Sequence, residues 1–499
     1  MTGFQIALLS VYAGLLSFIF LYSVIQINLA LNYLWSKKRR CADSNKCMSG
    51  KETDVPFVTI QLPVYNEKYV VERLIDAVVE FEYPKDRFEI QVLDDSTDET
   101  VQIIHDKIAQ VVAATGLDIQ HVRRDNRKGF KAGALAEGLL HAKGEFVAIF
   151  DADFVPNADF LHRTVPYFVD EKIGVVQTRW EHINEDYSIL TKLQAFGLNA
   201  HFSVEQSGRN AHGHFINFNG TAGIWRKSCI EDAGGWHSDT LTEDLDLSYR
   251  AQLKGWRFKY LENVGSPAEL PAAMNALKTQ QFRWTKGAAE CARKNLWKVL
   301  IARNLPFSTK IHALFHLMNS FLFICIISTA ILSVPLLYVK SQLGELSEMF
   351  GKGSFFLLSI VFLGVFYWVA FSSHGNKKGF GLFTFFVKFP VFLSVSMGLS
   401  LHNAIAVFEG YIGKKTPFVR TPKFNIKANS DKWKENKYLT SSLNWLTVME
   451  GILALYFIGG IFLAFVLSDF SLIPFHIMLS LGFGMVFFYS IDHSRNIPS

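Results

Sequence analysis

Two carboxylates one residue apart are the strongest chemical signal in this 499-residue chain. Asp151 and Asp153 come after the apolar run Phe146–Ile149. A strand that ends in Asp-x-Asp projects both carboxylates into the crevice where open α/β sheets bind ligands. Two close carboxylates repel each other unless a cation lies near, and their hard oxygens suit Mg²⁺ or Mn²⁺ carried by a pyrophosphate. The pair therefore predicts a metal site, although Asp-x-Asp alone also occurs as an ordinary strand-end turn.

A second acidic segment, Asp239–Asp246, precedes a predicted helix. Thr242 could cap that helix, with Glu243 and Asp244 merely favouring its dipole. However, four of these eight residues are acidic, which is more than a cap requires. We interpret Glu243 as part of the substrate site and Asp244 as a general base.

A polar and aromatic group lies further along the chain, on an expected helix. Arg283 and Trp284 lie three and four residues after Gln280, so all three can point to one side of the helix. Arginine offers a planar fork to a leaving diphosphate, and tryptophan offers a stacking surface to a sugar ring. The alternative is an aromatic and basic belt at a membrane surface, which would not need the glutamine.

Two further segments suit a nucleotide. Asp94 and Asp95 end a second apolar strand, where acidic residues can accept hydrogen bonds from a ribose or a base. The alternative is a capping box for the next helix, because Asp98 and Glu99 come just after them. Residues 127–134 place cations and glycines at a helix start, which attracts phosphate, unless they form only a solvated basic loop.

The elements that must position these residues alternate between strand and helix. Strands are expected at 57–63, 88–93, 118–122 and 146–149, and helices at 70–81, 100–114 and 131–141. This alternation predicts a parallel sheet with right-handed crossovers, within a domain at 55–300. The chain has no G-x-G-x-x-G and no P-loop motif, which argues against dinucleotide and P-loop folds.

Apolar segments flank this domain and predict a membrane protein. Hydrophobic residues make up 49% of the chain, and the net charge of +5 fits the positive-inside bias better than nucleic-acid binding. Residues 4–35 are almost wholly apolar and end at Lys37–Arg40, which predicts a membrane helix within 1–36 and a cytoplasmic location for the domain after it. Five cysteines without a C-x-x-C pair indicate neither a disulfide framework nor a zinc site.

The remaining residues, 301–499, are expected to form interfacial and transmembrane helices. The apolar runs are 311–339, 355–371, 381–411, 445–467 and 472–489. If each run crossed the membrane once, the basic loop at 412–442 would lie outside, against the positive-inside rule. We therefore interpret 381–411, which contains Pro390, as a bent or re-entrant pair of half-helices.

Taken in order, these motifs resemble the D, D-x-D, T-E-D, Q-x-x-R-W signature of the family 2 glycosyltransferases. The residues are Pro63–Glu67, Asp94–Ser96, Asp151–Asp153, Thr242–Asp244 and Gln280–Trp284. The chain most resembles the membrane-embedded cellulose, hyaluronan and cellulose-synthase-like mannan and glucan synthases. Pro417–Thr421 is similar to their gating loop, with Arg420 departing from the F-x-V-T pattern.

The resemblance implies an α/β glycosyltransferase A-type (Rossmann-like) domain and a role for each motif. Pro63, Glu67, Asp95 and Lys131 would line the nucleotide pocket, with Asp151 and Asp153 holding the metal. Asp244 would deprotonate the acceptor hydroxyl, and Gln280, Arg283 and Trp284 would hold the diphosphate and the acceptor end. Asn219, Gly220 and Thr221 would line the acceptor site.

The expected function is hexose transfer, with inversion, from UDP-glucose or GDP-mannose to a growing β-linked polysaccharide that is extruded across the membrane. One alternative adds a single sugar to a membrane lipid, because the amphipathic region 296–315 would suit lipid docking. The other is a catalytically silent scaffold or transporter. Transport needs no Asp-x-Asp with Q-x-x-R-W, and no ionisable cluster is evident in the spans, which disfavours that alternative.

Overall fold

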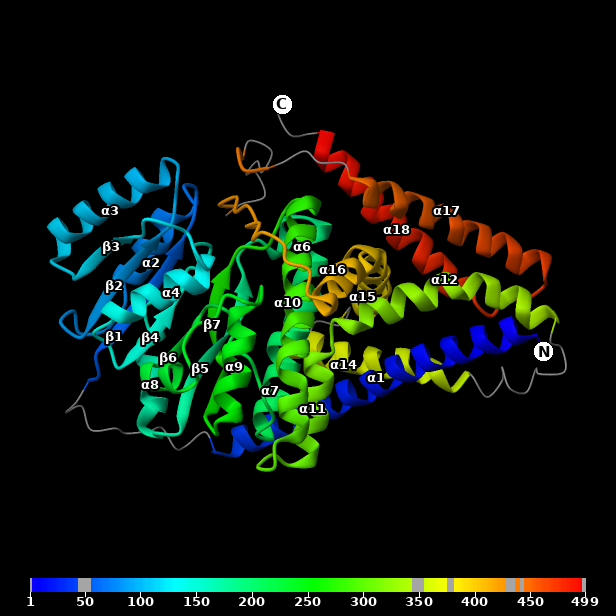
Figure 1. The fold of residues 1–499 in the computed structure, drawn as a ribbon, viewed down its shortest axis with the longest axis horizontal. Helices are drawn as coiled ribbons and strands as arrows, with labels where there is room; N and C mark the ends of the chain where they lie inside the picture. The colour runs from blue at the N-terminus through cyan, green and yellow to red at the C-terminus, as the bar shows by residue number, and fades with distance from the viewer. Residues whose placement is uncertain are drawn as a thin grey trace.

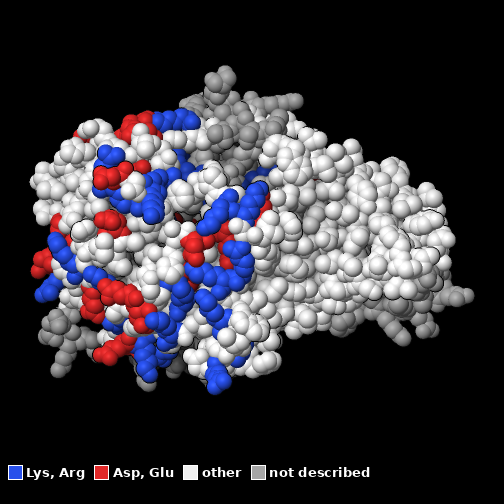
Figure 2. Space-filling view, in the orientation of Figure 1, with Lys and Arg blue, Asp and Glu red and all other residues white. Residues whose placement is uncertain are grey.

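A β-sheet domain and a set of long helices form the two halves of the molecule (Figure 1). The computed structural model describes residues 2–43, 55–342, 354–374, 381–426, 436–439 and 444–495. In Figure 2, lysine, arginine, aspartate and glutamate gather on the visible face of the sheet half, whereas the helical half on the right is almost free of them. This division matches the predicted change in composition along the chain.

The sheet has seven strands in the order β3-β2-β1-β4-β6-β5-β7. Their bounds are β1 Val58–Val64, β2 Phe88–Asp94, β3 Ile119–Arg123, β4 Phe146–Ile149, β5 Ile173–His182, β6 Gly223–Arg226 and β7 Arg257–Ala268. The prediction of an α/β sheet is confirmed, and β1 to β4 are parallel as expected. The sheet as a whole is mixed, because β6 runs antiparallel to both β4 and β5.

The register of β1 brings the predicted acidic strand ends together. Val64 of β1 lies opposite Asp94 of β2, and Gln61 lies opposite Ile149 at the end of β4. The residues after β2 and β4 therefore emerge at one edge of the sheet, on either side of β1. This edge is where ligands bind in open α/β sheets.

Helices cover both faces of the sheet, and α2, α3 and α4 begin within one residue of the predicted starts at 70, 100 and 131. The shorter ones are α2 Val71–Val79, α3 Thr100–Thr115, α4 Phe130–His141, α5 Phe160–Thr164, α6 Ile189–Ala200, α7 Gln206–Ala211, α8 Lys227–Asp232 and α9 Glu243–Leu253. Single turns lie at η1 Val165–Val169 and η2 Glu185–Tyr187, and a π-helical turn, η3, at His201–Glu205. In α2 the apolar residues that recur at helical spacing are the buried ones: Val71, Leu74, Ile75 and Val78.

A 28-residue helix, α10 (Met274–Ile301), stands between the two halves (Figure 1). It packs against α9 and α11 (Phe307–Leu317), and also against α16 (Ser400–Ile412) and α18 (Ile473–Arg495). Lys278 on α10 donates hydrogen bonds to Glu450 (2.6 Å) and Ser490 (2.8 Å) of the helical half. The helix that carries the predicted Q-x-x-R-W group is thus tied to both parts of the chain.

Among the described residues, five helices are long and apolar enough to cross a membrane. They are α1 Gly3–Asp43, α12 Phe321–Gln342, α15 Gly381–Gly398, α17 Trp445–Val466 and α18. The apolar helix α14 (Leu358–Ser373), preceded by the turn η5 Ser354–Leu357, is shorter. α1 continues to Asp43, past the predicted end at 36, so Lys37 and Lys38 are part of the helix.

Two apolar runs are each divided between two helices. The run expected at 311–339 forms α11 and α12, because the chain turns between Leu317 and Phe321. The run at 381–411 is divided between α15 and α16, but α15 alone is long enough to cross a membrane, so the interpretation as a pair of half-helices stays a prediction. Gly398 ends α15 where the backbone of α18 approaches closely: a Cβ at Gly398 would lie 2.3 Å from the carbonyl oxygen of Gly482. Part of the predicted loop 412–442, at 427–435 and 440–442, lies outside the described residues.

Candidate active site

A cavity of about 190 Å³ opens at the carboxyl edge of the sheet, between the sheet domain and α10. Most of the predicted site residues line it: Pro63, Glu67, Asp95, Lys131, Asp151, Asp153, Asn219, Gly220, Glu243, Asp244, Gln280, Arg283 and Trp284. Asp94 and Thr221 are not among the lining residues. Motifs spread over more than 200 residues of sequence therefore meet in one place.

Asp151 is held by a lysine and by its own backbone. Lys131 Nζ donates to Asp151 Oδ1 (2.5 Å) and to the carbonyl oxygen of Gly220 (2.9 Å). The Asp151 backbone N–H donates to the Thr221 hydroxyl at 2.8 Å. Thr221 was expected to line the acceptor site, but it is not among the residues that line the cavity. Its hydroxyl instead holds the backbone of Asp151.

Asp153 has one carboxylate oxygen paired and one without a hydrogen bond among the described residues. Lys423 Nζ lies 2.7 Å from Asp153 Oδ2, whereas the buried Oδ1 has no partner. A buried carboxylate oxygen is costly to leave unsatisfied. Together with Asp151 two positions earlier, this oxygen could serve as a ligand to a divalent cation, and the metal site at this pair stays a prediction.

The acidic pair Glu243 and Asp244, at the start of α9, lines the cavity, and the pKa of both carboxyl groups is raised. Burial, together with the negative charge of Glu243, raises the pKa of Asp244 to about 7, against the lowering effect of Lys131. Burial also raises the pKa of Glu243. A base with a pKa near the working pH is the most effective proton acceptor. Thr242 occupies the N-cap position of α9, but its side chain makes no capping hydrogen bond, so the alternative interpretation of this segment as a side-chain cap is not supported.

One face of α10 forms a wall of the cavity. Gln280, Arg283 and Trp284 all line it, as their helical spacing predicts. Arg283 donates to the Thr421 hydroxyl at 2.8 Å, and the Trp284 ring lies 6.4 Å from the Trp180 ring. Trp180 and His182, at the end of β5, also line the cavity and were not predicted, because nothing in their local pattern distinguishes them from ordinary strand residues.

A segment after α16, which includes Phe418, Arg420 and Lys423, also lines the cavity. Arg420 Nη1 pairs with Glu67 Oε2 at 2.8 Å, and Phe418 stacks on Phe130 with ring centroids 5.6 Å apart. Burial raises the pKa of Glu67 to about 7, although Arg420 and Lys423 lower it. The resemblance to a gating loop identified this segment, but the ion pairs of Arg420 and Lys423 could not be read from the sequence.

The predicted nucleotide carboxylates occupy different environments. Asp95 lines the cavity and accepts a hydrogen bond from Arg124 Nε at 2.9 Å. Asp94 is 1% exposed and is bonded to His121 Nε2 and to the Ser96 backbone N–H, both at 2.8 Å. The Asp94 side chain is therefore buried and hydrogen-bonded within the protein, and it does not line the cavity as the prediction required.

The alternative interpretation of this segment, a capping box at the start of α3, is not supported, because the N-cap residue Glu99 makes no side-chain capping hydrogen bond. The Thr100 backbone N–H at the start of α3 donates to Asp98 Oδ1 at 3.0 Å.

Arg127, in the predicted phosphate segment, lies over the Tyr65 ring with its guanidinium carbon 3.3 Å from the centroid. Both residues line the cavity, so a cation and an aromatic ring are available to a ligand there.

Comparison with known proteins agrees with this site. Residues 56–287 match the model of the family described as "Glycosyltransferase like family 2". Glucomannan 4-beta-mannosyltransferase 9 of Arabidopsis thaliana is 36% identical over 392 residues, which cover 75% of this chain and 69% of that protein. The chain is a family 2 glycosyltransferase. The predicted resemblance to the cellulose-synthase-like mannan synthases is thereby confirmed.

Other relatives of this glycosyltransferase extend the comparison. Glucomannan 4-beta-mannosyltransferase 1 of Oryza sativa subsp. japonica is 35% identical over 410 residues, covering 79% of this chain and 74% of that protein. A mannosyltransferase from Pyrobaculum calidifontis, solved with GDP-Man and Mn²⁺, superposes with a TM-score of 0.51. It covers 80% of this glycosyltransferase and all of its own chain at 20% identity, so this likeness concerns the fold.

Proposed function

We propose that this glycosyltransferase transfers mannose from GDP-mannose to a growing 4-β-linked polysaccharide, with inversion at the anomeric carbon. One observation supports the reaction above others: Asp151, Asp153 and the base candidate Asp244 line one cavity together with Arg283 and Trp284. The names of the relatives support mannose and the 4-β linkage. UDP-glucose remains the alternative donor.

Asp151 and Asp153 would hold a Mg²⁺ or Mn²⁺ ion, which would neutralise charge on the diphosphate when bound. Lys131 and Lys423 keep these carboxylates oriented, at 2.5 Å and 2.7 Å. Arg283 lies on the opposite wall, where its fork suits the leaving nucleoside diphosphate. These cations would stabilise the charge that develops as the glycosidic bond to the nucleotide breaks.

Asp244 would take the proton of the acceptor hydroxyl as that oxygen attacks the anomeric carbon. The hydroxyl oxygen forms the new bond, the diphosphate leaves with the bonding electrons, and the single displacement inverts the anomeric configuration. Trp284 and Trp180 offer aromatic faces on which the acceptor sugar could stack. Holding the donor and the acceptor next to each other in one cavity would supply much of the rate enhancement.

We further propose that the five candidate spans anchor the enzyme in a membrane, with the catalytic domain on the cytoplasmic side, where nucleotide sugars are made. The polysaccharide would then leave between the helices that pack around α10. The basic loop 412–442 would also be cytoplasmic, in keeping with the positive-inside rule. No part of this function calls for nucleic acid.

The test uses membranes from an overexpressing host, with Asp244→Asn as the matched control. Labelled GDP-mannose and UDP-glucose are supplied separately with Mn²⁺ or Mg²⁺, and the products are divided into chloroform-soluble and ethanol-insoluble fractions. Insoluble label from GDP-mannose that a β-mannanase digests, and that Asp244→Asn abolishes, is the expected result. Label in the lipid fraction alone would instead support transfer of one sugar to a membrane lipid. Equal label from Asp244→Asn would contradict the proposed base.

A further inference from the structure

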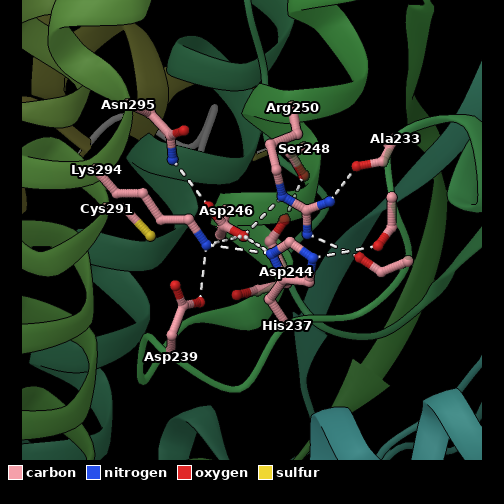
Figure 3. Close-up of polar contacts among 12 residues, drawn as sticks. Ala233, His237, Asp239, Asp244, Asp246, Ser248, Arg250, Cys291, Lys294 and Asn295 are labelled. Carbon is pink, nitrogen blue, oxygen red and sulfur yellow. Dashed lines mark hydrogen bonds and ion pairs between the residues drawn. The ribbon is translucent and has the colours of Figure 1, made fainter.

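Asp246 lies two residues after the proposed base and faces away from the cavity. Its side chain is fully buried, and it lines neither the cavity described above nor the smaller one beside it. Because consecutive helical residues are about 100° apart, Asp244 and Asp246 point to nearly opposite sides of α9. Figure 3 shows Asp246 directed toward α10, among side chains from both helices.

Donors from both helices saturate this buried carboxylate. Asn295 Nδ2 donates to Oδ1 at 2.9 Å, and Lys294 Nζ and Arg250 Nε donate to Oδ2 at 3.0 and 2.8 Å. Burial alone would raise the pKa of Asp246, but the hydrogen bond from Asn295 and the charges of Arg250 and Lys294 outweigh it and hold the pKa below its usual value. The carboxylate is therefore a permanent negative charge between α9 and α10.

The same side of α10 also holds the segment that precedes α9. Lys294 Nζ donates to Asp239 at 2.8 Å, and Glu290 Oε2 accepts from the Leu241 backbone N–H at 2.8 Å. At Gly287 the two segments approach so closely that a Cβ would lie 2.5 Å from Thr242 Cγ2. The acidic segment thus runs along successive turns of α10.

The group has a second chemical interpretation, as a metal site. His237, Asp239 and Asp246 bring potential ligand atoms within 4.8 Å of one another. The Lys294 ammonium already lies among them, 3.3 Å from His237 Nδ1 and hydrogen-bonded to both carboxylates. A bound metal would have to displace this cation, so the geometry favours an ionic clamp over a metal centre.

We propose that Asp246, Lys294 and Asn295 form a clamp that fixes α9 against α10 and thereby positions Asp244 relative to Gln280, Arg283 and Trp284. The inference rests on the proposed function, because it assigns Asp244 as the base. α9 carries the group that takes the proton, and α10 carries the groups proposed to hold the diphosphate and the acceptor. A shift of about 1 Å between them would cost on the order of 100-fold in rate. The three residues of the clamp are positioning residues, since none lines the cavity.

The test compares Asp246→Asn and Asn295→Ala with Asp232→Asn in purified, detergent-solubilised enzyme. Asp232 offers a matched control, because it too accepts a lysine ion pair (Lys254, 3.0 Å) near α9 but is half exposed. The assay measures release of the nucleoside diphosphate, which reports on transfer from any donor. Melting temperature and binding of GDP with Mn²⁺ are measured on the same samples.

The clamp predicts a fall in kcat of at least about tenfold for Asp246→Asn, with donor KM within about twofold, because the proposed metal ligands Asp151 and Asp153 lie on neither helix. Asn295→Ala keeps both ion pairs, and we expect a smaller fall in kcat of about threefold with GDP binding unchanged. Asp232→Asn should change neither constant. A role in stability alone would lower the melting temperature but would leave the kcat of the folded enzyme unchanged.

A double-mutant cycle measures the coupling between Asp246 on α9 and Lys294 on α10. Losses in kcat from Asp246→Asn and Lys294→Met should be strongly non-additive, because each variant breaks the same contact. Unchanged kcat in folded Asn295→Ala and Asp246→Asn, or a donor KM that rises as much as kcat falls, would overturn the clamp. If Asp246→Asn does not fold, Asn295→Ala decides alone. A wild-type enzyme that releases UDP from UDP-glucose and does not use GDP-mannose would refute the proposed donor and still test the clamp.

Discussion

The Lys423 ammonium lies 2.7 Å from Asp153, although 270 residues separate them in sequence. Both side chains are largely buried, with exposed fractions of 17% and 6%. Lys423 is anchored there by its neighbours, because Glu269 accepts hydrogen bonds from the backbone N–H groups of Phe424 (2.8 Å) and Asn425 (2.9 Å). A lysine from the loop after α16 is therefore paired with Oδ2 of Asp153, one of the two proposed metal ligands.

Removal of this cation should strengthen metal binding. In Lys423→Met, Asp153 loses its positive partner, so we expect half-maximal activity at a Mn²⁺ concentration about tenfold lower, the equivalent of one charged hydrogen bond. Titration of Mn²⁺ into metal-free enzyme measures this. Lys414→Met, which removes a lysine paired with Glu409 at the end of the same helix, is the control. An unchanged or higher Mn²⁺ requirement in Lys423→Met would show that the lysine does not compete with the ion.

The rate should depend on pH through the acidic pair on α9. Asp244 must be deprotonated to accept a proton, and its pKa is raised to about 7, so kcat should rise with pH through about 7 and level off above it. Glu243 contributes to that raised pKa by its negative charge. In Glu243→Gln the acid limb of the pH–rate profile should therefore move to lower pH. A limb that stays in place would mean that Glu243 does not tune the base.

Asp94 and Asp95 should respond differently to the same substitution. Asp94→Ala leaves His121 and the Ser96 N–H without their buried acceptor, which should destabilise the protein by about 1–3 kcal/mol. We expect donor KM to change little, because Asp94 does not line the cavity. Asp95→Ala should raise donor KM. Denaturant unfolding and initial rates measure the two effects, and a raised KM in folded Asp94→Ala would contradict this assignment.

Gly220 should tolerate no side chain, for reasons of space and of backbone conformation. Its φ is +78°, and a Cβ would lie 3.1 Å from Asp244 Oδ2 and 3.5 Å from Lys131 Nζ. Gly220→Ala should cost about 1 kcal/mol in strain and also lower kcat, since it displaces the proposed base. Gly116→Ala is the matched control: its φ is +66°, and no atom of the described residues lies within 4 Å of a Cβ at this position, so only stability should fall. Equal kcat in both variants would argue against crowding at Asp244.

Local patterns in the sequence were enough to place most of the sheet and much of the site. Alternating apolar runs gave β1, β2 and β4, and helical spacing gave α2 and the shared face of Gln280, Arg283 and Trp284. These features depend on neighbours a few residues apart, so the sequence carries them directly. Asp151 and Asp153 were identified for the same reason, because their position is set by the strand before them.

Tertiary structure alone decided the features that depend on distant partners. β2 extends to Asp94, which turns that carboxylate toward His121 and leaves Asp95 for the cavity. The antiparallel β6, the pairing of Lys423 with Asp153 and the contact of Asp246 with α10 likewise join residues far apart in the chain. A buried charge must find a partner, but the sequence does not say which one, because that choice depends on how separately formed elements pack.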